Sequence, residues 1–232
     1  MKSFQTFLFA AILLVVAAIL ASIASSPVEA VYGADVSGLF STSNYECARK
    51  EYGWDFLIAR GFHSYGAVDP NGGKNLDAAK AAGIAHRDLY FFPCYAPGRK
   101  SAKQQVTEFY NYYKSYLDTG SMMWFDIETN ASPGCQYAKG IDSCTFMAEL
   151  IEAARGLQIH SGIYSSEYEW GTVMGASCTA GSSRGQQLWV ANYNGVPGDN
   201  GPLFGGWTRA VIHQYEGTTN GCGISFDKNY YP

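Results

Sequence analysis

The sequence lacks the signals of proteins that bind nucleic acids or nucleotides. Its formal net charge is −4, and it contains no run of Lys or Arg that could form a basic surface for a phosphate backbone. It contains no G-x-G-x-x-G sequence and no phosphate-binding loop. We therefore expect no nucleic-acid partner and no nucleotide cofactor.

Metal-binding and esterase signatures are absent as well. The four histidines are scattered along the chain, and none belongs to an H-E-x-x-H sequence. No G-x-S-x-G sequence provides the strand-to-helix turn on which a serine esterase carries its nucleophile. We expect any chemistry of this protein to proceed without a metal or a cofactor.

Only one long apolar run occurs, and it lies near the N-terminus. Phe7–Ile23 carries no charge, follows Lys2 and precedes the small-x-small sequence Val28-Glu29-Ala30. These features predict a secretory signal peptide over residues 1–30, with an uncleaved membrane anchor as the alternative. No second apolar span follows, so we expect residues 31–232 to form one soluble domain with a substantial core and no membrane contact.

All cysteines follow the predicted signal peptide. An even number in this position predicts an oxidising compartment, outside the cell or in a lysosome or phagosome, and up to three disulfides. The six residues are Cys47, Cys94, Cys135, Cys144, Cys178 and Cys222. Their spacing does not select one set of pairs, but the short separation favours a Cys135–Cys144 bond.

Apolar strand patterns alternate with helical patterns along most of the chain. The predicted strands are Tyr32–Ser37, Phe56–Ala59, Leu89–Phe92, Met122–Glu128, Ile159–Tyr164, Leu188–Ala191, Ala210–Tyr215 and Ile224–Asp227. The predicted helices are Ser43–Tyr52, Leu76–Ala82, Ser101–Leu117, Cys144–Ala154 and Ser166–Met174, each after one of the first five strands. This order predicts an α/β fold, a modified TIM-like barrel of five β/α units followed by three strands without helices. An open, doubly wound sheet is the alternative.

The fourth predicted strand ends in two acids. Because side chains of a strand alternate between its faces, Trp124, Asp126 and Glu128 share one face, while Phe125 and Ile127 share the other. If the acids face the barrel interior, they lie at its mouth and the two apolar residues pack against helices. The opposite register would bury both acids under the helices, which is costly. A strand end whose acids point into solvent is the simpler alternative.

Two further acids belong to the first and last predicted strands. Asp35 lies late in the first strand and Asp227 late in the eighth, and these strands are neighbours in a closed barrel. Four carboxylates close together raise at least one pKa, because they cannot all ionise cheaply. A carboxylic acid that stays protonated can donate its proton to the leaving oxygen of a glycosidic bond. Asp35 could instead be a turn or cap residue, and Asp227 a surface acid.

Aromatic and amide side chains occur at the ends of several predicted strands. Together they predict a groove for a sugar chain, although each aromatic residue alone is more typical of a core. The predicted substrate-binding residues are Tyr90, Tyr164, Trp189, Asn192, Tyr193, Gln214 and Tyr215. The sequon Asn130-Ala131-Ser132 lies close to this mouth and precedes Pro133, so we predict that it carries no glycan.

These residues occur in an order that resembles the glycoside hydrolase family 25 lysozymes, the Chalaropsis-type muramidases, in their invertebrate or protist form. The matching segments are Tyr32–Ser37, Val68–Asn71, Trp124–Glu128, Leu188–Tyr193, His213–Tyr215 and Phe226–Asp227. The resemblance implies a barrel and hydrolysis of the β-1,4 bond between N-acetylmuramic acid and N-acetylglucosamine in bacterial peptidoglycan. It implies that Glu128 is the general acid/base and that Asp126 orients the N-acetyl group of the substrate, with Asp35 and Asp227 as supporting carboxylates. We expect a monomer that acts at mildly acidic pH.

Three alternatives stay open. A barrel enzyme acting on chitin is one, but the D-x-x-D-x-D-x-E pattern of family 18 chitinases is not present. A non-catalytic protein that binds peptidoglycan or chitin is another, although both acids of the fourth strand are present. The third is an anchored ectodomain with a structural or signalling role, if the N-terminal segment is retained.

Overall fold

The structure, a computed structural model, describes residues 30–96, 98–136 and 141–232. Residues 1–29 of the predicted signal peptide lie outside the described residues. Within the described ranges, no helix is long and apolar enough to cross a bilayer.

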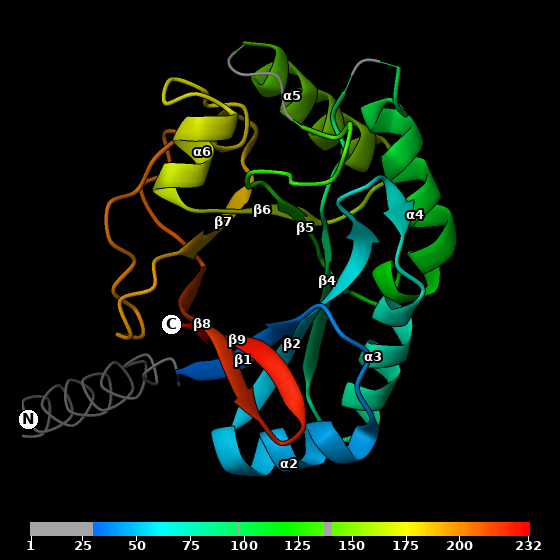
Figure 1. Cartoon of the computed structure of the whole chain (residues 1–232), viewed down its shortest axis with the longest axis vertical. Coiled ribbons are helices and arrows are strands. Elements are labelled where there is room, and N and C mark those ends of the chain that lie inside the picture. The colour runs from blue at the N-terminus through cyan, green and yellow to red at the C-terminus, as the bar shows by residue number, and fades with distance from the viewer. Residues whose placement is uncertain (1–29, 97, 137–140) are drawn as a thin grey trace, which may run out of the picture.

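Strands and helices alternate in the first part of the chain, and strands alone form its end (Figure 1). The elements are β1 (Val31–Val36), α2 (Thr42–Tyr52), β2 (Trp54–His63), β3 (Ala67–Val68), α3 (Asn71–Ala81), β4 (His86–Phe91), α4 (Ala102–Leu117), β5 (Met123–Asp126), α5 (Ile141–Gly156), β6 (Ser161–Ser165), α6 (Glu167–Val173), the 3₁₀ helix η1 (Ser182–Arg184), β7 (Gln187–Ala191), β8 (Ile212–Gly221) and β9 (Ile224–Tyr231). In the described part of the chain, five α-helices follow the first five main strands and none follows β7, β8 or β9, as predicted.

The sheet closes on itself. Its strand order is β1-β9-β8-β7-β6-β5-β4-β2, and β1 also pairs with β2, which completes a barrel. The two-residue strand β3 only extends the end of β2 through an antiparallel pairing. The predicted barrel is therefore confirmed, and the open doubly wound sheet is excluded.

One strand direction differs from a barrel in which all strands are parallel. β9 is antiparallel to both of its neighbours, β8 and β1, whereas β1, β2 and β4 to β8 pair in parallel. Only Cys222 and Gly223 connect β8 to β9, and both have positive φ angles, 52° and 73°. A two-residue turn of this kind joins antiparallel strands, because a parallel connection needs a crossover of about a dozen residues.

The helices form where local signals predict them, and the largest change of boundary is at the start of α3. α4 begins at a capping box in which Ser101 and Gln104 bond to each other's backbone, and its buried face includes Phe109 and Tyr113. α3 begins at Asn71 rather than at Leu76, because Asp69 Oδ1 accepts a hydrogen bond from Asn71 N and starts the first turn. The glycines of that turn allow close packing, since a Cβ on Gly72 would collide with the carbonyl oxygen of Arg60.

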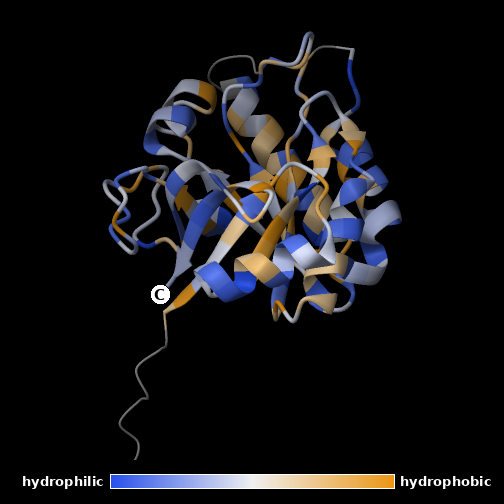
Figure 2. Cartoon of the chain, turned by 60° about the horizontal axis from the view of Figure 1, so that its bottom comes forward, coloured by the Kyte–Doolittle hydropathy of each residue, from blue (hydrophilic) through white to orange (hydrophobic). Residues whose placement is uncertain are grey.

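Two apolar layers hold the barrel together. A small cluster fills its interior and consists of Phe56, Ile58, Trp124, Trp189 and Ile212. A larger cluster lies between the sheet and the helices and includes Phe125 and Ile127. Figure 2 shows the most hydrophobic residues along the central strands, with the helices mostly hydrophilic outside. The predicted alternation along β5 is confirmed, because Trp124 points inward and Phe125 outward.

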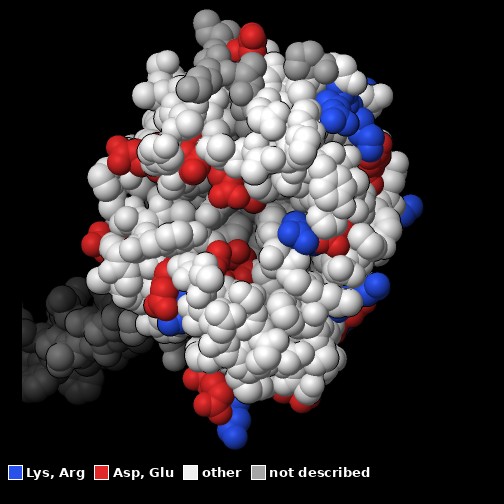
Figure 3. Space-filling model, in the orientation of Figure 1, with Lys and Arg blue, Asp and Glu red and all other residues white. Residues whose placement is uncertain are grey.

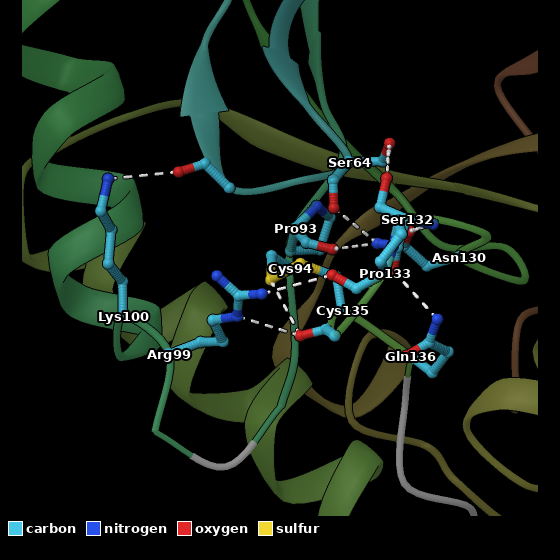
Figure 4. The surroundings of a disulfide bond; sticks show 12 residues. Ser64, Pro93, Cys94, Arg99, Lys100, Asn130, Ser132, Pro133, Cys135 and Gln136 are labelled. Atoms are coloured by element: carbon cyan, nitrogen blue, oxygen red, sulfur yellow. Dashed lines mark hydrogen bonds between the residues drawn. A yellow bond between two sulfur atoms is a disulfide. The ribbon is translucent and has the colours of Figure 1, made fainter.

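The six cysteines form three disulfides, but the predicted Cys135–Cys144 pair is wrong. The bonds are Cys47–Cys222, Cys94–Cys135 and Cys144–Cys178. Cys94 and Cys135 follow β4 and β5, which are neighbours in the sheet (Figure 4). Cys144 lies on α5 and bonds to the segment after α6 instead. The paired cysteines lie on segments that the barrel brings together, and the distance between two cysteines along the sequence does not show which segments these are.

Candidate active site

The strand β5 delivers its two acids to the interior of the barrel mouth. Asp126 is its last residue and is only 7% exposed, and Glu128 lies two residues further on and is half-buried. Ile127 N donates a hydrogen bond to Tyr164 O, which keeps the chain beside β6 beyond the end of the strand. Glu128 therefore projects to the same side as Asp126, although it lies outside the strand.

The other two acids meet the pair across the barrel. Asp35 on β1 and Asp227 on β9 are direct partners in the antiparallel register. Asp227 thus reaches the mouth because β9 runs against the other strands, not because it lies late in a parallel strand. All four carboxylates line one cavity of about 130 Å³. Figure 3 shows acidic side chains around the hollow in the middle of this face.

A hydrogen-bond network organised by Gln214 fixes these acids. Its Nε2 donates to Asp35 Oδ2 at 2.7 Å and to Asp227 Oδ2 at 3.3 Å. Its Oε1 accepts hydrogen bonds from the hydroxyls of Tyr164 and Tyr193, at 2.7 and 2.8 Å. One amide therefore links two carboxylates to two aromatic walls of the cavity.

Asn229 is a member of this network that our sequence reasoning missed. Its Nδ2 donates to Asp35 Oδ2 at 2.7 Å, and its Oδ1 accepts a hydrogen bond from Trp189 Nε1 at 2.7 Å. Asn229 is fully buried. The alternation of side chains along a strand could have identified Asn229, because it lies two residues after Asp227 and therefore shares its face.

Burial raises the pKa of every acid in the cavity, and the charges of neighbouring acids add to the shift for Asp35, Asp126 and Glu128. Burial, followed by the charge of Asp227, raises the pKa of Asp35 to about 8, although bonds from Asn229 and Gln214 oppose the shift. Burial, then the charge of Glu128, raises the pKa of Asp126 well above its usual value. Burial and the charges of Glu169 and Asp227 raise the pKa of Glu128 to about 7. Burial also raises the pKa of Asp227.

One oxygen of the Asp126 carboxyl group is unsatisfied inside the protein. Its Oδ1 is buried and has no hydrogen-bond partner among the described residues. A buried carboxyl oxygen without a partner is costly in a site that serves stability alone. Asp126 lines the cavity together with Glu128, so the environment of its carboxyl group is that of a site and not of an apolar core.

Arg60 is a second residue that sequence reasoning missed. Arg60 follows Phe56 and Ile58 on β2 at intervals of two residues. The alternation of side chains along the strand therefore predicts a cation inside the barrel. Arg60 Nε bonds Asp69 Oδ2 at 2.8 Å, and Asp69 is 1% exposed. The charge of Arg60 lowers the pKa of Asp126 and partly opposes the effect of the acids.

The predicted substrate-binding residues fall into three groups. Tyr90, Tyr164, Trp189, Tyr193 and Gln214 line the carboxylate cavity, with Trp189 buried below Tyr164 at a ring distance of 4.5 Å.

Asn192 lines an adjoining groove of about 390 Å³, which shares Glu128, Tyr164 and Tyr193 with the cavity. The side chains of α6 and of the loop after β7 form its walls. His213 holds this loop, since its Nε2 lies 2.9 Å from Asn192 O and its Nδ1 accepts a bond from Gly198 N.

Tyr215 does not belong to the cavity. Gln214 faces the interior, so alternation along β8 turns Tyr215 outward, where it lines a separate pocket with Tyr32 and Tyr52. The prediction treated all residues at the end of this strand alike and ignored the period of two. Tyr215 is therefore removed from the predicted substrate-binding set.

The side chain of the sequon residue Asn130 is buried close to the site. Asn130 is 3% exposed, and its Nδ2 donates to the carbonyl oxygens of Ser64 and Pro93 (Figure 4). Its Oδ1 accepts a hydrogen bond from Ser132 N. The amide that would carry a glycan therefore has both hydrogens engaged inside the protein, which supports the prediction of an unoccupied sequon.

The fold and the site together define a class: an α/β barrel with paired carboxylates at its mouth, the arrangement of barrel-type glycoside hydrolases. Residues 26–215 match the family model described as "Lysozyme-like protein 1". The chain is 36% identical over 208 residues to the probable GH family 25 lysozyme 2 of Dictyostelium discoideum, covering 88% of this chain and 92% of that protein. The chain belongs to the glycoside hydrolase family 25 lysozyme-like proteins.

Further comparisons agree with this assignment. Lysozyme-like protein 5 of Caenorhabditis elegans is 36% identical over 202 residues, covering 86% of this chain and 91% of that protein. The bacterial lysozyme from Streptomyces coelicolor aligns with a TM-score of 0.64 at 23% identity, over 88% of this chain and 93% of its own. At that identity the structural likeness supports the barrel fold.

Proposed function

We propose that this protein is a lysozyme that hydrolyses the β-1,4 bond between N-acetylmuramic acid and N-acetylglucosamine in bacterial peptidoglycan. The observation that carries the proposal is the pair of acids at the end of β5, in which burial and nearby charges raise the pKa of Glu128 to about 7. Such an acid is protonated at mildly acidic pH and can serve as a general acid. No cofactor is needed for this reaction.

Glu128 and Asp126 have different roles in the proposed mechanism. Glu128 donates its proton to the glycosidic oxygen as the bond to the anomeric carbon breaks. The carbonyl oxygen of the substrate's own N-acetyl group attacks that carbon, and Asp126, which lines the cavity with Glu128, orients the N-acetyl group. Glu128, now ionised, then removes a proton from the water that opens the cyclic intermediate, so the anomeric configuration is retained.

The remaining residues of the cavity support this pair. Asp35, whose pKa is raised to about 8, keeps its proton at mildly acidic pH and supports the site as a neutral group. Asp227 supports the pair from β9, and its ionised form stabilises the positive charge that develops on the sugar ring in the transition state. Gln214 and Asn229 hold Asp35 in place. Tyr90, Tyr164 and Tyr193, with Asn192 in the adjoining groove, provide surfaces for the sugar rings.

The test is the lysis of bacterial cell walls, followed as loss of turbidity at pH 5 to 6. We expect Glu128→Gln to reduce lysis by about a hundredfold or more, because an amide cannot donate the proton. Glu46→Gln removes an exposed acid on α2 and serves as a matched control with unchanged lysis. Equal lysis by the wild type and Glu128→Gln would refute the role of Glu128. Wall binding without lysis would instead assign a non-catalytic protein that binds peptidoglycan or chitin.

A second experiment separates the two possible roles of Asp126. The substrate-assisted route forms no bond between the protein and the sugar, so mass spectrometry with a slow substrate should find no sugar attached to Asp126. Retention of the anomeric configuration, observed by proton NMR, accompanies this route. A trapped covalent sugar on Asp126 would make it the nucleophile, and an inverted product would indicate direct attack by water.

The setting of the activity is part of the same proposal. We infer that residues 1–30 form a signal peptide and that residues 31–232 form the catalytic barrel of a secreted or lysosomal/phagosomal monomer. Three disulfides suit an oxidising compartment. Digestion of bacteria or defence against them is the corresponding biological role, and N-terminal sequencing of the secreted protein tests the cleavage site.

A further inference from the structure

We propose that Glu169 is a positioning residue for Glu128: it fixes the backbone that follows Glu128 and places a negative charge beside that acid. This inference rests on the proposed role of Glu128 as the general acid. Glu169 lies on α6, in the groove next to the four-carboxylate cavity, and sequence reasoning did not single it out.

The contact between Glu169 and the chain after Glu128 is specific. Glu169 Oε2 accepts hydrogen bonds from both the backbone nitrogen and the hydroxyl of Thr129, each at 2.7 Å. Thr129 is the residue directly after Glu128, beyond the end of β5. Because no strand pairing holds Glu128 itself, these two bonds restrain its backbone from the side of α6.

The position of Glu169 on its helix makes this contact unusual. Glu169 is the third residue of α6, and Ser166 Oγ at the N-cap accepts a hydrogen bond from Glu169 N. In a capping box, the residue at this position also bonds the N-cap backbone, as Asn44 does in α2 and Gln104 in α4. The Glu169 carboxylate turns instead to Thr129, which is 40 residues away in the sequence.

Charged and titratable groups face Glu128 from every side of the cavity. Asp126 lies on β5, Asp227 on β9 and Asp35 on β1, while Arg60 on β2 provides a cation whose charge acts on Asp126. Three tyrosine hydroxyl groups also line the cavity, from Tyr90 on β4, Tyr164 on β6 and Tyr193 after β7. In the adjoining groove, Glu167 and Tyr168 on α6 line the same space as Glu128.

Of all charged groups around Glu128, Glu169 contributes most to the raised pKa of Glu128, and Asp227 comes next. The charge of Glu169 also raises the pKa of Asp126. A negative charge next to an acid stabilises the protonated form of that acid. Glu169 therefore extends the pH range over which Glu128 holds the proton that the reaction needs.

The test compares Glu169→Gln with the wild type by NMR titration and by kinetics. Glutamine keeps a side-chain oxygen that accepts both bonds from Thr129 but removes the charge. We expect the titration midpoint of the Glu128 carboxyl carbon to fall by about one pH unit. The alkaline limb of the pH profile of kcat/KM should shift to lower pH by the same amount. The Glu128 signal is identified by its loss in Glu128→Gln. Glu46→Gln on α2 is the matched charge control and should leave both readouts unchanged.

Glu169→Ala separates the charge from the restraint. This variant loses the charge and both bonds to Thr129, so we expect the same shift in pH dependence and an additional loss of kcat of about tenfold at the optimum, with KM little changed. Rescue of kcat by glutamine but not by alanine would support the positioning role. Equal kcat values for Glu169→Ala and the wild type would overturn it.

The outcomes also distinguish this inference from the proposed function. An unchanged Glu128 midpoint in Glu169→Gln would overturn the inference, even if wall lysis by the wild type and its loss in Glu128→Gln support the lysozyme assignment. Absence of wall lysis by the wild type would overturn the proposed function. The NMR midpoint would then decide by itself whether Glu169 controls the protonation of Glu128.

Discussion

Replacement of Asp35 by asparagine should stabilise the folded protein at neutral and alkaline pH. Burial and the charge of Asp227 raise the pKa of Asp35 from 3.8 to about 8, so the folded state holds a proton that the unfolded state releases. The stability linked to this proton is fully present below pH 3.8 and is lost as the pH rises through about 8. Asparagine is uncharged at every pH, so the variant should not show this loss.

The structure sets the size of the expected effect. A shift from 3.8 to about 8 corresponds to about 6 kcal/mol at about 1.36 kcal/mol per pH unit. The whole shift overstates the effect, because the repulsion belongs to Asp35 and Asp227 jointly and because the Asp35 side chain is partly exposed. We therefore expect the free energy of unfolding of Asp35→Asn to exceed that of the wild type by about 2 to 4 kcal/mol at pH 8. Asparagine retains an oxygen that accepts the bonds from Gln214 Nε2 and Asn229 Nδ2.

Urea unfolding with intact disulfides measures this effect. The free energy of unfolding of Asp35→Asn, minus that of the wild type, should rise by about 2 to 4 kcal/mol between pH 4 and pH 8. Glu46→Gln, at an exposed position, should change little over the same range. If the wild type and Asp35→Asn lose the same stability between the two pH values, Asp35 is not protonated in the folded state and the explanation of its raised pKa is wrong.

Three further predictions concern activity and modification. Wall lysis should fall as the pH rises above about 7, where Glu128 loses its proton, and an optimum above pH 8 in a pH–rate profile would contradict this role. Gln214→Leu should lower kcat/KM by about tenfold or more because it removes four hydrogen bonds, whereas Tyr215→Ala, on the outer face of β8, should stay within about twofold of the wild type. Intact-mass measurement of the secreted protein should find no glycan on Asn130, and a glycosylated mass would show that its buried amide is accessible during secretion.

Local patterns in the sequence predicted much of the architecture. The capping box of Ser101 and Gln104 marks the start of α4, and alternation along β5 assigns Asp126 and Phe125 to opposite faces. Both signals depend only on residues close in the chain, which is why they can be read without a structure. The same alternation, applied to β8 and β9, would have excluded Tyr215 from the predicted substrate-binding residues and identified Asn229 as a residue of the site.

Contacts between distant segments could not be read in this way. The pairing of Asp35 with Asp227 depends on the antiparallel direction of β9, which the turn at Cys222 and Gly223 imposes. The three disulfides join segments that the barrel brings together, and the hydrogen bonds that Thr129 donates to Glu169 join two β/α units.

The order of strands and helices could be predicted from sequence patterns, as could the inward face of the acidic strand with its two acids, because periodicity and turn chemistry act locally. The groups that surround those acids, and their effect on the protonation of the acids, depend on how the chain folds. A pKa depends on burial and on charges that arrive from β1, β9 and α6, and these distances exist only once the barrel has closed.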